Sequence, residues 1–158
     1  MYIEKYWGNY IGGSDDSLTL LGYFMDKGES ELTLGEIFKD HGLDKLNWDF
    51  TTSDELGFID SEGLEYDFYY AIDLVTDLAA LILECSVNES FTPAELMGDE
   101  DDISIRLILS DDEKKELNDA LKNFVNNPMD YDIQEMMDEE ELREMATEIE
   151  ELRKDLFE

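Results

Sequence analysis

The chain has 158 residues and a formal net charge of −32, because 43 Asp and Glu stand against only 11 Lys and Arg. Such a charge repels nucleic acid and anionic membranes, which argues against direct binding to either. The length corresponds to one domain, and the hydrophobic content of 42% is too high for a disordered chain. We therefore expect a single acidic globular domain over residues 1–158, a monomer, with a basic protein as its partner.

The acidic residues are distributed along the whole chain. Residues 1–70 carry 16 acidic and 4 basic side chains, residues 71–98 carry 5 and 0, and residues 99–158 carry 22 and 7. The charge therefore belongs to the fold and is not an appended tail. It either attracts a basic protein or only serves solubility or a saline cytoplasm, and the sequence leaves both interpretations open.

Two features predict a cytoplasmic protein. Cys85 is the single cysteine, so no disulfide can form within the chain. The first ten residues lack the long apolar core of a signal peptide. We expect Cys85 to be a buried packing residue and not a nucleophile.

The N-terminal third predicts a short strand followed by two helices. Residues Tyr2–Tyr10 are rich in aromatic side chains and are expected to form the strand, which the Gly/Ser/Asp segment at 12–17 ends. A helix is predicted over Ser17–Lys27, with Leu18, Leu21 and Met25 on its buried face. A second helix begins at the capping box Thr33–Glu36 and ends near Gly42.

The middle of the chain predicts a hairpin and then a buried helix. Leu56–Ile59 and Leu64–Tyr70 flank a turn-forming loop, and the second strand alternates apolar and polar residues as a half-buried strand does. Ala71–Cys85 follows directly and contains eleven apolar residues. Its acidic residues fall on one narrow stripe, so the helix must be covered on most sides. The apolar run is too short and too interrupted to span a membrane.

The C-terminal half predicts a short helix at Thr92–Gly98, a strand at Ile103–Leu109 and two long helices. The first long helix begins at the capping box Ser110–Glu113 and runs to about Asn126. The second covers about residues 138–157 and has an apolar seam that is expected to dock on the body of the domain. The predicted fold class is α+β, with a small, mostly antiparallel sheet packed against the central apolar helix and flanked by the C-terminal helices.

The sequence predicts no catalytic, cofactor-binding or metal-binding residue. His41 is the only histidine, which excludes Ser-His-Asp triads and multi-histidine metal sites, and we expect it to be a cation near a helix end. A pair of carboxylates can support hydrolysis, but it is no evidence for an enzyme in a chain that contains 43 acidic residues. The acidic run Asp99–Asp102 is contiguous and lacks the spacing of an EF-hand loop, although weak divalent-cation binding stays an alternative.

The candidate residues for binding a basic partner are acidic clusters and aromatic side chains. Two clusters flank the predicted strand Ile103–Leu109, which would separate them by roughly 23 Å and suit the basic groove of a nuclease. The aromatic residues belong either to the core, which is the favoured interpretation, or to an interface. Any of Trp7, Tyr10 and Tyr69 that is exposed is a candidate anchor, because Tyr and Trp are enriched at binding hot spots. The full set is Asp99, Glu100, Asp101, Asp102, Asp111, Asp112, Glu113, Asp15, Asp16, Trp7, Tyr10 and Tyr69.

Three stretches resemble the small bacterial immunity proteins of polymorphic-toxin and contact-dependent growth-inhibition systems: YWGNYIGGSDDSLTLL, GLDKLNWDF and AIDLVTDLAALILEC. The resemblance implies a cytoplasmic, non-enzymatic inhibitor that binds the toxin domain of a cognate effector, often a nuclease. Two alternatives stay open. One is a nucleic-acid mimic or adaptor that binds another basic protein, and the other is a carboxylate enzyme or divalent-metal binder.

Overall fold

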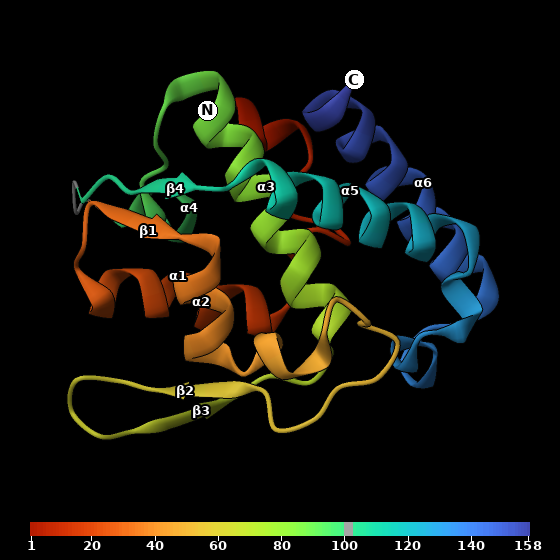
Figure 1. Cartoon of the computed structure of the whole chain (residues 1–158), viewed down its shortest axis with the longest axis horizontal. Coiled ribbons are helices and arrows are strands. Elements are labelled where there is room, and N and C mark those ends of the chain that lie inside the picture. Colours follow the sequence, from red (N-terminus) through yellow and green to blue (C-terminus); the bar gives the residue numbers. More distant parts are fainter. Residues whose placement is uncertain (100–102) are drawn as a thin grey trace.

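The computed structural model describes residues 1–99 and 103–158, and it confirms the α+β class (Figure 1). The helices in these residues are α1 (Asp15–Lys27), α2 (Leu34–His41), α3 (Ala71–Asn88), α4 (Pro93–Met97), α5 (Asp111–Asn126) and α6 (Glu139–Phe157). The strands are β1 (Glu31–Thr33), β2 (Gly57–Ile59), β3 (Glu65–Asp67) and β4 (Arg106–Ile108). Short 3₁₀ turns occur at Tyr2–Lys5, Leu43–Leu46, Pro128–Asp130 and Asp132–Glu135.

Helix α3 is the centre of the fold, as its composition predicts. Every residue from Ala71 to Glu84 is buried. The turn Tyr2–Lys5, α1, α5, α6 and β4 all pack against it, so it is covered on most sides (Figure 1). An almost wholly apolar helix is stable in water only when other elements cover it in this way.

Side-chain caps fix where the helices begin. The predicted boxes at Thr33–Glu36 and Ser110–Glu113 are present, with reciprocal hydrogen bonds between side chain and backbone. Helix α1 begins two residues earlier than predicted, because Ser14 provides its cap. Its buried face is also different from the predicted one, since Leu18 is 52% exposed. The buried side chains of α1 are Asp16, Ser17, Leu20, Leu21, Tyr23 and Phe24.

The predicted N-terminal strand is wrong. Residues Tyr2–Lys5 form a 3₁₀ turn that packs on α3, and Ile3 is completely buried. The physical reason lies in hydrogen bonding: the amide of Ile3 donates to the buried carboxylate of Glu84 at 2.9 Å, not to a neighbouring strand.

The strands form two separate pairs in the described residues. β2 and β3 are the predicted antiparallel hairpin, whereas β1 and β4 pair in parallel with Leu32 opposite Leu107. The alternation in Ile103–Leu109 correctly predicts that Ile105 and Leu107 point inward. The predicted buried face of β3 is wrong, since all three of its residues are exposed and only the following Phe68 is buried.

The C-terminal helices cover one side of α3. Helix α6 packs against both α5 and α3 (Figure 1). The residues of its apolar seam are buried from Leu142 to Leu152, and Leu156 is half-buried. The opposite face of α6 carries a row of exposed glutamates.

Candidate partner-binding surface

Three carboxylates of α3 form a buried row that holds the N-terminal segment. Asp73 accepts a hydrogen bond from the Ser14 hydroxyl at 2.8 Å. Asp77 accepts from the Gly12 amide at 2.7 Å and from the Ser17 hydroxyl at 2.5 Å. Together with Glu84 and its bond from Ile3, this row fixes residues 3–17 against the central helix. The acidic stripe of α3 is therefore an internal anchor and is not a binding surface.

Burial of this row changes its acidity. Desolvation raises the pKa of Asp73 to about 6; the Ser14 hydrogen bond opposes the rise, and the nearby charge of Asp16 adds to it. Desolvation and the charge of Asp73 also raise the pKa of Asp77 well above its ordinary value. Burial therefore makes both carboxyl groups weaker acids than the exposed carboxylates of the surface.

Asp16, one of the predicted partner-binding residues, belongs to this interior. It is 5% exposed, and its carboxylate accepts the backbone N–H of Tyr69 at 2.9 Å. That bond ties α1 to the end of the hairpin. The prediction that Asp16 contacts a partner is corrected, because its neighbours already cover it.

The other predicted acidic residues lie on separate parts of the surface. Asp15 is exposed in the first turn of α1, and Asp99 is exposed just after α4. Asp111 and Asp112 are exposed at the start of α5, whereas Glu113 is half-buried and caps that helix through Ser110. Glu100, Asp101 and Asp102 lie outside the described residues. The structure therefore does not bring these residues together into one described cluster.

The predicted aromatic anchors differ in their accessibility. Trp7 is half-buried, and its ring lies so close to Gly12 that a Cβ there would be 2.1 Å from a ring atom. Tyr10 is half-buried, and its hydroxyl donates to Glu144 of α6 at 2.7 Å. Tyr69 is 75% exposed, the most accessible large apolar side chain of the described residues. Of the three, Tyr69 is best placed to meet another molecule.

The hairpin and α1 expose further apolar side chains, whose exposure the sequence does not predict. We define the hairpin surface as Leu18, Ile59, Leu64, Tyr66 and Tyr69, which are between 37% and 75% exposed. Carboxylates lie on the same two elements, at Asp15 and Asp26 of α1 and at Asp60, Glu62, Glu65 and Asp67 of the hairpin. The charge here has little compensation, because the chain contains no Lys or Arg between Lys45 and Arg106. The absence of Lys and Arg from this part of the sequence is the feature that could have identified the surface.

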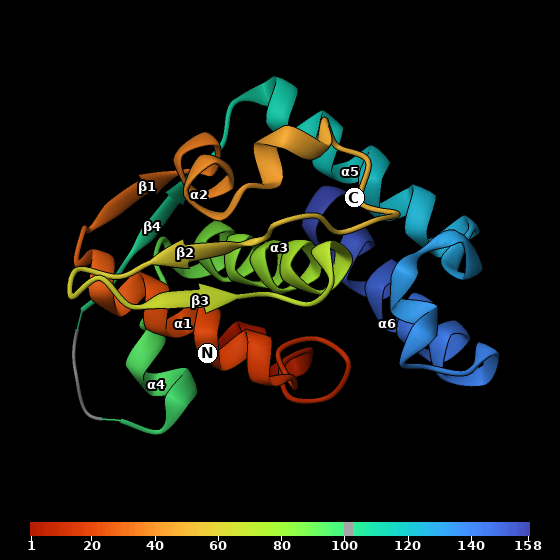
Figure 2. The same ribbon diagram turned by 90° about the horizontal axis from the view of Figure 1, so that it is seen from below.

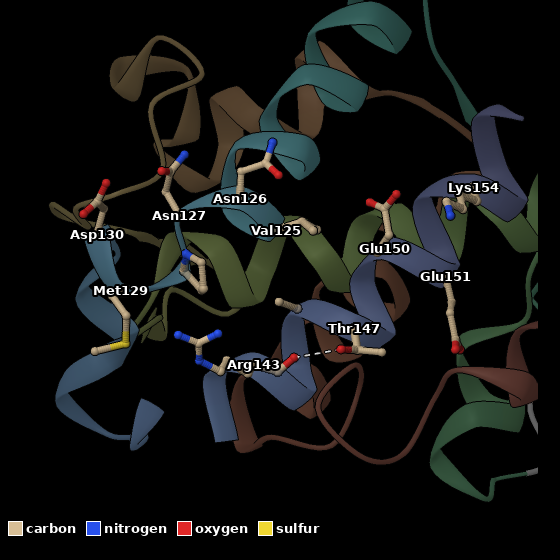
Figure 3. Close-up of a pocket in the computed structure, with 12 residues that line it drawn as sticks. Val125, Asn126, Asn127, Met129, Asp130, Arg143, Thr147, Glu150, Glu151 and Lys154 are labelled. Atoms are coloured by element: carbon tan, nitrogen blue, oxygen red, sulfur yellow. Dashed lines mark hydrogen bonds between the residues drawn. The ribbon is translucent and has the colours of Figure 1, made fainter. Parts of the chain in front are cut away.

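A recess lies between the end of α5, the turn Pro128–Asp130 and α6 (Figure 3). Its volume is about 720 Å³, and both signs of charge line it. Arg143 pairs with Glu139 at 2.6 Å, and the Arg153 guanidinium holds the pKa of Glu150 below its ordinary value. The Thr147 hydroxyl donates to the carbonyl of Arg143 at 3.0 Å. This mixed, internally paired lining gives the recess no preference for a basic partner.

The groups with potential chemical reactivity serve packing. His41 is fully buried, its Nδ1–H donates to the Ile37 carbonyl at 2.7 Å, and burial lowers its pKa to about 4. The expectation of a cationic His41 is therefore wrong: desolvation outweighs the attraction of the helix end. Burial raises the pKa of the half-buried Cys85 thiol to about 11, which favours the unreactive thiol.

Residues 1–99 and 103–158 contain no group of three or more His, Cys, Asp or Glu side chains arranged to hold a metal ion. None of the helices in the same residues combines the length and apolarity needed to cross a membrane.

The fold and its surface define an acidic α+β protein that exposes both apolar side chains and carboxylates. A family model described as Immunity protein 68 matches residues 2–156. The chain therefore belongs to this family of bacterial immunity proteins, and membership indicates a toxin-neutralising role. Comparisons with curated proteins and with solved structures gave no match.

Proposed function

We propose that this immunity protein binds the basic C-terminal toxin domain of a cognate effector in the cytoplasm and neutralises it as a 1:1 complex, without enzymatic action. One observation carries the proposal: the acidic surface has little internal compensation. In residues 1–99 and 103–158, only six carboxylates lie within ion-pair distance of a cation. The remaining surface carboxylates are available to positive charge on another molecule, which speeds and orients association.

A nuclease is the class of toxin that this surface fits best. A nuclease binds the phosphate backbone through Lys and Arg, so its active groove is basic. A protein of net charge −32 competes for that groove by the same electrostatic attraction. Occupying the groove would block the nucleic acid without any chemical change to the toxin.

The experiment uses the toxin domain encoded beside this gene, inactivated by substitution in its own active site. Titration calorimetry at low salt is expected to give a 1:1 complex whose Kd rises when NaCl is increased from about 50 to about 500 mM. Absence of a complex at low salt, or an affinity indifferent to salt, would overturn the proposal.

A second readout separates binding from enzymatic inactivation. With the active toxin, inhibition should reach completion at one equivalent of the immunity protein and should be reversed when the complex is dissociated. The mass of the recovered toxin should be unchanged. Inhibition at far less than one equivalent, or a modified toxin, would instead indicate an enzyme.

A further inference from the structure

In the part of the chain that the structure describes, the outer edge of β3, beside α1, pairs with no other strand. Hydrogen bonds from Phe68 N–H to Leu56 O and from Asp60 N–H to Leu64 O, each 2.9 Å, set the alternation of the antiparallel pair. Glu65 and Asp67 consequently occupy positions whose N–H and C=O point away from β2. Within the described residues no third strand joins this sheet. Figure 2 shows β3 on the α1 side of the hairpin and β2 on the α2 side.

A small cleft accompanies this edge. Its volume is about 260 Å³, and Leu18, Gly22 and Tyr66 line it together with Asp26 and Asp60. Two hydrogen bonds hold the hairpin against α1. Asp26 accepts the Ser61 hydroxyl at 2.6 Å, and Asp16 accepts the Tyr69 amide at 2.9 Å. The edge of β3 is thus held in place before any partner arrives, which lowers the entropy lost on binding.

Gly22 leaves space on the α1 side of the cleft. It lies inside α1, where glycine destabilises a helix relative to alanine. A Cβ at this position would meet nothing within 4 Å, so no packing within the described residues requires a glycine. The missing side chain instead keeps the floor of the cleft open next to Leu18 and Tyr66.

The negative charge along the edge of β3 determines which kind of strand can pair with it. Glu65 and Asp67 disfavour pairing with a second copy of this chain, because like charges opposite one another destabilise a sheet. The same carboxylates favour a strand that carries Lys or Arg. The exposed apolar side chains of Leu18 and Tyr66 provide contacts for an apolar residue between the basic ones.

We propose that the toxin domain docks an extended, basic segment along the free edge of β3, over Leu18 and Gly22 of α1. This inference rests on the proposed function and assigns the surface by which it is performed. The segment adds a third strand to the hairpin, its backbone bonds to Glu65 and Asp67, and an inward side chain enters the cleft.

The test measures the Kd of the inactivated toxin domain for variants of the full chain. Gly22→Gln fills the cleft, and Glu65→Pro removes an edge N–H at a position where proline is tolerated in an edge strand. Each is expected to weaken binding by about tenfold or more, the loss expected from one or two good contacts. The matched control Ser86→Gln, on the exposed far end of α3, should change Kd less than about threefold. Glu65→Gln keeps the N–H but loses the charge, so it should weaken binding less than Glu65→Pro does. The melting temperature of Gly22→Gln should be unchanged or higher, because glutamine is the better helix former.

Hydrogen exchange of the wild-type complex provides a readout that needs no variant. The outward amides of Glu65 and Asp67 should gain protection when the toxin domain binds. Wild-type affinity in Gly22→Gln and Glu65→Pro, or unprotected Glu65 and Asp67 amides, would overturn this docking mode while leaving the proposed function intact. Absence of any wild-type complex would overturn both.

Discussion

The free energy of unfolding of Asp73→Asn, measured relative to that of wild type, should increase as the pH rises. Asp73 is 6% exposed, and burial raises its pKa from 3.8 to about 6. Between these values the native state holds a proton that the unfolded chain releases, so the free energy of unfolding falls as pH increases. Above pH 6 the full effect is present, and it amounts to about 3 kcal/mol. Asparagine keeps an acceptor for the Ser14 hydroxyl but has no such proton to lose.

The assay is urea unfolding followed by circular dichroism at pH 4.5 and pH 8 for wild type and Asp73→Asn. About 2 kcal/mol of the pH effect falls within this interval. The free energy of unfolding of Asp73→Asn relative to wild type should therefore rise by that amount between the two conditions. Asp119→Asn, at an exposed position of α5, is the control and should show no such change. A constant difference between Asp73→Asn and wild type at both pH values would refute the reasoning.

Three further predictions follow from the packing. Glu84→Ala should lower the free energy of unfolding by about 1–3 kcal/mol, because it leaves the buried Ile3 amide without its acceptor. Glu84→Gln keeps an acceptor and should lower it much less. Urea unfolding measures both variants. Gly57→Ala should destabilise by about 1–3 kcal/mol, since its Cβ would lie 2.2 Å from the Tyr66 carbonyl oxygen; intact thermal stability would contradict the close strand contact. The pKa of His41 is lowered to about 4, so its ring should stay neutral from pH 5 to 8; an NMR titration that detects protonation in this range would show that the ring is solvated.

Local chemistry explains why the helix starts could be predicted. A capping box is complete within four residues, so Thr33–Glu36 and Ser110–Glu113 form whatever surrounds them. The run Ala71–Cys85 likewise predicts its own burial, because an almost entirely apolar helix has no other stable state in water. The alternation in Ile103–Leu109 predicts which side chains point inward.

Contacts between distant segments could not be predicted in this way. Nothing in the alternation of Ile103–Leu109 indicates that β4 pairs in parallel with β1, about 75 residues earlier. The aromatic N-terminus looks like a strand until Glu84 is known to accept the Ile3 amide. The same limitation applies to Asp16. Its position at the start of a helix predicts an exposed carboxylate, but that carboxylate accepts a hydrogen bond from the Tyr69 backbone.

The candidate site was only partly visible in the sequence. Tyr69 was identified by residue type, and its high exposure leaves it accessible to a partner. The alternation of apolar and polar residues in Leu64–Tyr70 predicts a half-buried strand with Leu64 and Tyr66 on its buried face. In the structure both side chains are exposed, Leu64 at 55% and Tyr66 at 37%. Periodicity tells which residues share a face, and it does not tell whether another element covers that face.

The most direct test of the charge-based account is the association rate constant between this protein and the inactivated toxin domain, measured by stopped flow across ionic strength. Electrostatic steering predicts that the rate constant falls by about tenfold or more from about 50 to about 500 mM NaCl. An association rate that stays constant over this range would show that the carboxylates do not guide the encounter.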